Sequence, residues 1–152
     1  MSPEDLRALI PQHKRDFDRA NALVDVGYPA VAPILPRLLV WLQDSNWPIS
    51  SVLSNFLASI GAPLSPHLRE ILAGDDGSWK SSIMRGVIGA NTEFFALFKG
   101  ELERIANSPT LSERAEQVDE DARDILAHGP VVSNNLDPRI DSRQPDPRWR
   151  PR

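Results

Sequence analysis

Apolar positions recur with helical spacing along most of the chain. The clearest run, spaced three or four residues apart, is Ile49, Val52, Leu53, Phe56, Leu57 and Ile60. At 100° per residue these positions form one stripe along a helix. Similar stripes occupy residues 64–72, 79–88, 94–105 and 111–126, and no segment alternates convincingly as a strand would. The pattern predicts an all-α protein of about seven helices over residues 3–128.

Glycine and proline affect where these helices begin and end. Residues 29–42 are expected to form one long helix, with Pro33 and Pro36 delaying its regular part. The stripe over residues 94–105 predicts either one helix or two helices divided at Gly100. A capping box at Thr110 and Glu113 predicts the start of the last helix.

Two sequence echoes indicate a repeated helical unit. Gly27-Tyr28-Pro29 and Gly61-Ala62-Pro63 each follow an apolar helix end and lie 34 residues apart. Glycine accepts the left-handed conformation that ends a helix, and proline suits the first turn of the next one. Trp47 and Trp79, 32 residues apart, each follow polar residues able to cap a helix. A period in this range predicts a right-handed α-α superhelix of the HEAT or armadillo type.

Composition divides the chain into two parts. Residues 1–128 carry the helical pattern and are expected to form one domain. Residues 129–152 hold five prolines and five arginines with almost no apolar periodicity, which predicts a flexible, disordered tail. The sequence has no cysteine, no membrane-length apolar stretch and no basic, apolar signal at its start, so we expect a cytoplasmic protein without a membrane partner.

Charge separates the same two parts. The whole chain carries −4, whereas residues 1–128 carry −6 and the tail is mildly basic. A groove for nucleic acid would be lined with Lys and Arg. The acidic balance therefore disfavours a nucleic-acid partner, and with it a HEAT-like DNA-processing enzyme.

Two segments carry a resemblance to a known family. The run over residues 35–49, Leu-Pro-Arg-Leu-Leu-Val-Trp-Leu-Gln-Asp-Ser-Asn-Trp-Pro-Ile, resembles the hallmark segment of a small bacterial family of uncharacterised function. Residues 101–109, Glu-Leu-Glu-Arg-Ile-Ala-Asn-Ser-Pro, are similar to a second segment of it. The resemblance covers about residues 8–128, implies a HEAT-like fold and brings no catalytic residue. Lys99-Gly100 departs from the family pattern, where a proline would start the helix.

No pattern of catalytic or metal-binding residues is present in the sequence. His13, His67 and His128 fall on separate segments without metal spacing, and no nucleophile elbow, phosphate loop or dinucleotide fingerprint occurs. We therefore expect a non-enzymatic protein with no catalytic residues, no metal and no cofactor.

A strip of small polar residues is the candidate binding site. Ser51, Ser54 and Asn55 lie opposite the apolar stripe of their helix, where Lys and Glu would be usual. With Ser82 and Arg85 on the next inner helix they predict a concave binding strip, and Trp47 is expected at its rim. The strip suggests a protein partner and a monomer or weak homodimer. Alternatively, the small residues only allow a neighbouring segment, such as the tail, to pack closely.

An acidic surface offers a different function. Asp119, Glu120 and Asp124 crowd the last predicted helix and would suit an immunity-type inhibitor that neutralises a basic bacterial toxin. The plainer interpretation is a solvated helix face. The tail leaves three alternatives open: it docks on the acidic body, it serves as a peptide for another protein or a neighbouring copy, or it has no role.

Overall fold

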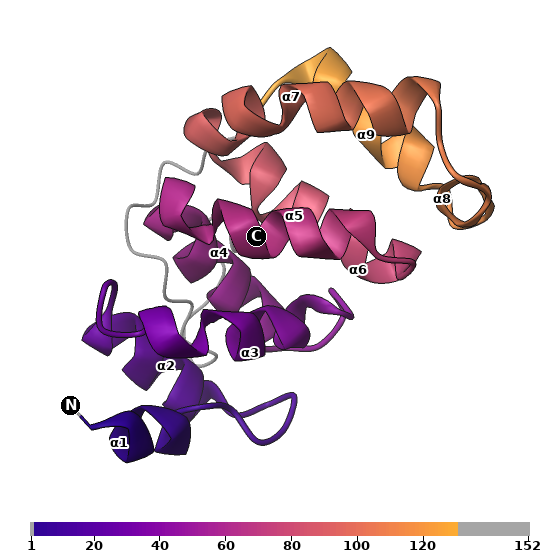
Figure 1. Ribbon diagram of the computed structural model, residues 1–152. Helices are drawn as coiled ribbons and strands as arrows, with labels where there is room; N and C mark the ends of the chain where they lie inside the picture. The colour runs from indigo at the N-terminus through magenta and orange to yellow at the C-terminus, as the bar shows by residue number, and fades with distance from the viewer. Residues whose placement is uncertain (1, 131–152) are drawn as a thin grey trace, which may run out of the picture.

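The computed structural model describes residues 2–130, which form helices arranged in three tiers (Figure 1). Helices α1 to α3 make the lowest tier in that view, α4 to α6 the middle one and α7 to α9 the upper one. This part of the chain contains no strand, which confirms the predicted all-α class. The predicted flexible tail, apart from Gly129 and Pro130, lies outside the described residues.

Residues 2–130 contain nine α-helices and four short 3₁₀ helices. The α-helices are α1 (Pro3–Ala8), α2 (Phe17–Val26), α3 (Leu35–Leu39), α4 (Ser50–Ile60), α5 (Ser65–Ala73), α6 (Gly77–Gly86), α7 (Thr92–Asn107), α8 (Leu111–Ala115) and α9 (Val118–His128). The 3₁₀ helices are Ala32–Ile34, Val40–Leu42, Ala62–Leu64 and Ile88–Ala90.

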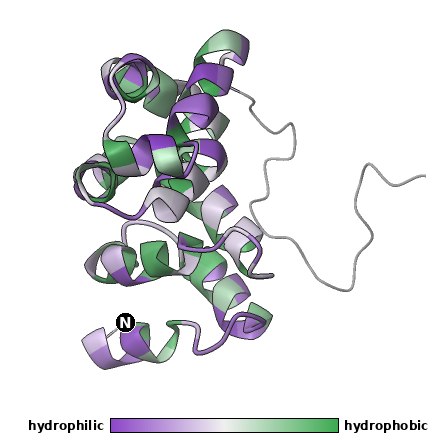
Figure 2. Ribbon diagram, turned by 90° about the vertical axis from the view of Figure 1, so that its right-hand side faces the viewer, coloured by the Kyte–Doolittle hydropathy of each residue, from purple (hydrophilic) through white to green (hydrophobic). Residues whose placement is uncertain are grey.

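Helix α4 lies at the centre of the core. Ile49 and four apolar residues of α4 are buried, as the stripe predicts: Ile49, Val52, Leu53, Phe56 and Leu57. The helix contacts both α2 and α6 and so joins two tiers. Hydrophobic and hydrophilic segments alternate along most helices in Figure 2, as expected of elements with one buried face.

The two Gly-x-Pro junctions differ in how the chain continues. Gly27 and Gly61 both have positive φ, 74° and 83°, and both end a helix as predicted. After Gly61 the chain enters the 3₁₀ helix Ala62–Leu64 at once and continues into α5. After Gly27, helical structure resumes only at Ala32. The restart expected at Pro29 is therefore wrong, whereas the restart at Pro63 is confirmed.

Two predicted helices are each broken into shorter elements. The single helix expected over residues 29–42 is wrong: α3 is flanked there by two 3₁₀ helices. Pro33 and Pro36 lack the N–H groups that a continuous helix needs, which explains the break. The last predicted helix is divided at Gln117, whose φ of 62° is left-handed, into α8 and α9. These breaks raise the number of helices above the predicted seven.

Helix α7, in contrast, is continuous through Gly100. Its apolar stripe, Phe94, Phe98, Leu102 and Ile105, is fully buried on both sides of the glycine. Packing of α7 against α9 holds this stripe in one helix and outweighs the low helix propensity of Gly100. A division at Gly100 is therefore wrong.

Candidate functional site

A groove of about 560 Å³ lies between α4 and α6. Seven of its eleven lining residues are serines, so its walls offer hydroxyl groups instead of long charged side chains. We call this feature the serine groove, and its lining residues are Ser45, Ser50, Ser51, Ser54, Ser78, Ser81, Ser82, Arg85, Gly86, Glu116 and Asp121.

The two long walls approach each other closely at one point. A Cβ atom on Gly86 of α6 would lie 3.1 Å from the Cβ atom of Ser54 on α4. That distance leaves little room for any larger pair of side chains. The small residues of the strip therefore have a packing role at Gly86 and Ser54, in line with the second interpretation of the strip.

Packing does not explain all of the hydroxyls. Ser54 donates to the carbonyl of Ser51, and Ser78 donates to the carbonyl of Gln43, each over 3.2 Å. Ser50 and Ser82 are buried as residues, with 3% and 8% of their surface exposed, but their hydroxyl oxygens are open to the groove and make no hydrogen bond to another described residue. These hydroxyls can therefore donate to and accept from a ligand that enters the groove.

Arg85 and Asp121 form the side of the groove nearest α9, and Asp124 lies beside Arg85 outside the lining. The Nε atom of Arg85 donates to Asp121 over 3.0 Å, and its guanidinium lies 3.6 Å from the carboxylate of Asp124. The hydrogen bond to Asp121, with the nearby charges of Asp121 and Asp124, raises the pKa of Arg85 above its ordinary value. The positive charge of Arg85 is thus already compensated, which makes the groove a poor site for an anion.

Glu116 holds the α8–α9 segment against the start of α6. Its Oε2 atom accepts a hydrogen bond of 2.9 Å from the amide of Gly77, the first residue of α6. A Cβ atom on Gly77 would overlap that carboxylate at 2.1 Å, so only glycine permits this contact. A carboxylate is favoured there because the first amides of a helix lack partners within the helix.

A buried ion cluster supports the same wall. Lys80 of α6 and Arg104 of α7 both donate to Glu113 of α8, over distances of 2.8–3.0 Å. Lys80 and Glu113 are almost fully buried. Burial alone would raise the pKa of Glu113, but hydrogen bonds from Arg104, the Thr110 amide and Lys80 outweigh it and lower the pKa to about 2. The cluster therefore stays ionised and fixes α8 beside α6 and α7.

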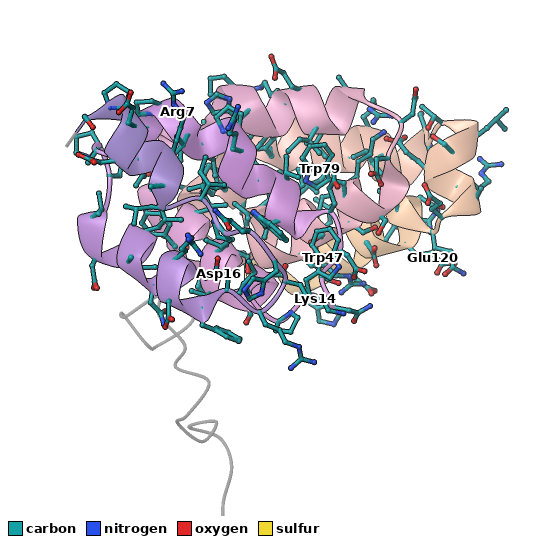
Figure 3. All side chains as sticks on the ribbon, turned by 90° about the horizontal axis from the view of Figure 1, so that it is seen from below. Arg7, Lys14, Asp16, Trp47, Trp79 and Glu120 are labelled. Carbon is teal, nitrogen blue, oxygen red and sulfur yellow. The ribbon has the colours of Figure 1, made fainter. Side chains whose placement is uncertain are left out.

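The structure brings together four of the six residues of the predicted strip. Ser51, Ser54, Ser82 and Arg85 line the serine groove. Asn55 is half-buried on α4 outside the lining. Trp47 also lies outside the lining and packs edge-on against Trp41 with ring centroids 5.5 Å apart; Figure 3 shows it nearer the edge of the view than Trp79.

Sequence reasoning missed the carboxylates of the groove. Ser78, Ser81 and Ser82 lie on one side of α6 at helical spacing, so the serine face of α6 could have been extended from the sequence. Glu116 and Asp121 come from a segment more than thirty residues away, and no spacing rule links them to α6.

The predicted acidic surface is not uniform. Asp119 is buried on α9 and pairs with Arg123 at 2.5 Å, and Asp124 faces Arg85. Glu120 is exposed and is drawn at the periphery in Figure 3. The three side chains therefore do not share one exposed face.

No helix of residues 2–130 is long and apolar enough to cross a membrane. Within the same residues, no group of three or more histidine, aspartate or glutamate side chains is placed to hold a metal ion. His13 and His128 are exposed and His67 is half-buried, each on a different segment.

The fold and the groove define an all-α protein with a hydroxyl-lined groove between two central helices. Residues 9–126 match the family model described as "Domain of unknown function (DUF5071)", and the chain belongs to that family. The matched range agrees with the resemblance to an uncharacterised family over residues 8–128. No curated protein matches the sequence.

Proposed function

We propose that the protein is a non-enzymatic binding module that holds an extended segment of a partner protein in the serine groove. The observation that carries the proposal is the lining of seven serines, of which Ser50 and Ser82 are largely buried and direct their unpaired hydroxyls into the groove. In this proposal the tiers form a HEAT-like, right-handed superhelix, and the groove is part of its concave face.

The chemistry of the lining favours a peptide backbone. Each serine hydroxyl both donates and accepts hydrogen bonds, and an extended peptide presents N–H and C=O groups in alternation. Most of the groove is uncharged. The hydroxyls can therefore replace most of the hydrogen bonds to water that a neutral, polar ligand loses when it binds.

The charges argue against two other ligand classes. Nucleic acid and small anions need free cationic groups, but the one arginine of the lining is held by Asp121 and Asp124. The net charge of −6 over residues 1–128 also repels nucleic acid and small anions electrostatically.

Selection of short random peptides against the full-length protein tests the proposal. Ser51→Trp should fill the groove from α4 and weaken binding of a selected peptide by about tenfold or more. Ser59→Trp is the matched control, because Ser59 is also exposed on α4 but lies outside the groove. Equal loss in both variants, or no peptide that binds, would refute a ligand site in the groove.

A further inference from the structure

Uncompensated negative charge lies beside the serine groove. Asp121 and Asp124 together balance Arg85 and leave one negative charge, and Glu116 adds a second. The carboxylate of Glu116 uses Oε2 for the Gly77 amide, and its side chain is exposed. The site therefore combines uncharged hydroxyls with an acidic rim, which suits a polar segment that carries basic side chains.

The chain itself contains such a segment. Residues 131–152 hold five arginines and three aspartates, and the last eight residues read Pro-Asp-Pro-Arg-Trp-Arg-Pro-Arg. Proline restricts the backbone toward extended conformations, which lowers the entropy lost when such a segment binds along a groove. The charge of this segment is opposite to that of residues 1–128.

The described part of the chain ends within reach of the groove. Asp121 of α9 lines the groove. Ile125, on the next turn of α9, lies 3.6 Å from the position that a Cβ atom on Gly89 would take, and Gly89 lies just beyond the end of α6. Helix α9 ends at Gly129, whose φ of 72° turns the chain. His128, the last residue of α9, lies seven residues or about 10 Å of helix beyond Asp121, a distance that three or four extended residues would span back to the groove.

The length of the segment is sufficient. The wall formed by α6 is ten residues long, or about 15 Å, which about five extended residues would cover. Attachment to α9 gives the segment an effective concentration on the order of millimolar, so that even weak contacts populate the bound state.

We propose that residues 131–152 bind in the serine groove of their own chain, with arginines at Glu116, Asp121 and Asp124 and the backbone along the serines. The inference rests on the proposed function, since it uses the same groove. A bound tail would compete with the partner segment, so the partner must displace it. The bound tail thus lowers the apparent affinity of the protein for its partner segment.

Paramagnetic broadening in the full-length protein tests this directly. Because the sequence has no cysteine, Pro151→Cys takes a single nitroxide label at the end of the tail. We expect the amide signals of Ser51, Ser54 and Ser82 to lose intensity relative to the reduced label, and those of Arg7 and Ala8 on α1, in the lowest tier of Figure 1, to keep it. Replacing Arg148, Arg150 and Arg152 with serine should remove most of the loss, and replacing them with lysine should retain it.

Three outcomes would overturn the proposal. The first is that the amide signals of the groove stay sharp, and the second is that their broadening persists after the arginines are replaced with serine. The third is that the broadening arises only between a labelled copy and a separate isotope-enriched copy, which would mean that the tail of a second copy occupies the groove. Failure here is distinct from failure of the proposed function. If the groove signals stay sharp but selected peptides still bind there, only the proposal for the tail is wrong. If the groove signals broaden but no peptide binds, only the proposal of a partner segment is wrong.

Discussion

The two faces of α4 have opposite chemistry although they belong to one helix. One face carries Val52, Leu53 and Phe56 into the core, and the other carries Ser51 and Ser54 into the serine groove. A solvated face would ordinarily bear long charged residues. The contrast indicates that the serine face is shaped by a close neighbour, α6 on one side and, in our proposal, a bound segment on the other.

Substitution of one residue on each face gives the largest contrast in stability. Phe56→Ala should lower the free energy of unfolding by about 3–5 kcal/mol, because it removes a buried aromatic ring. Ser51→Ala, on the exposed face, should change it by less than about 0.5 kcal/mol. Urea unfolding of both variants measures the difference, and similar values would mean that the faces are misassigned.

A second contrast compares the buried ion cluster behind the groove with a surface ion pair. Glu113→Gln leaves the buried ammonium of Lys80 without an ionised partner and should cost about 3–5 kcal/mol. Glu101→Gln breaks only the exposed pair with Arg69 and should cost about 1 kcal/mol or less. Equal losses in chemical denaturation would contradict the burial of the cluster.

The same cluster predicts a pH dependence. The pKa of Glu113 is lowered from 4.5 to about 2 in the folded protein. Its ionised form therefore contributes stability that is complete above about pH 4.5 and is lost as the pH falls toward 2, by up to about 3 kcal/mol. Thermal unfolding at several pH values should show a steeper acid decline in the native protein than in Glu113→Gln; parallel declines would assign the effect to other carboxylates.

Substitution of two glycines tests how closely α4 and α6 pack at the groove. Gly100→Ala should stabilise α7 by about 0.5–1 kcal/mol, since nothing lies within 4 Å of the added methyl group. Gly86→Ala gains less helix propensity, because Gly86 is the last residue of α6, and the added methyl group presses on Ser54, so it should be less favourable than Gly100→Ala by about 1 kcal/mol. Equal melting temperatures for the two variants would mean that α4 and α6 are not in tight contact at that point.

The sequence alone predicts the core better than the groove, for a physical reason. Burial of the α4 stripe follows from one periodic segment, and so does the helix end at Gly61. The division of the last helix at Gln117 follows from no local signal, because a left-handed glutamine is unusual.

The groove depends on contacts between distant segments. Ser51, Ser54, Ser82 and Arg85 could be found because each lies on a predicted helix face. Glu116 contributes to the site through a hydrogen bond to Gly77, and Trp47 packs against Trp41 outside the lining. Such tertiary contacts have no periodic signature in one sequence.

Amide chemical-shift mapping of a selected peptide on the full-length protein shows whether the peptide binds in the serine groove. A second hollow of about 360 Å³, lined by Val24, Gly27, Tyr28, Phe56, Ser59 and Ile60, provides the internal comparison on the same helix α4. If the peptide binds in the serine groove, the largest chemical-shift changes should occur at the amides of Ser50, Ser51, Ser54 and Ser82. Largest shifts at Gly27, Tyr28 and Ser59, with the serine groove unchanged, would contradict it.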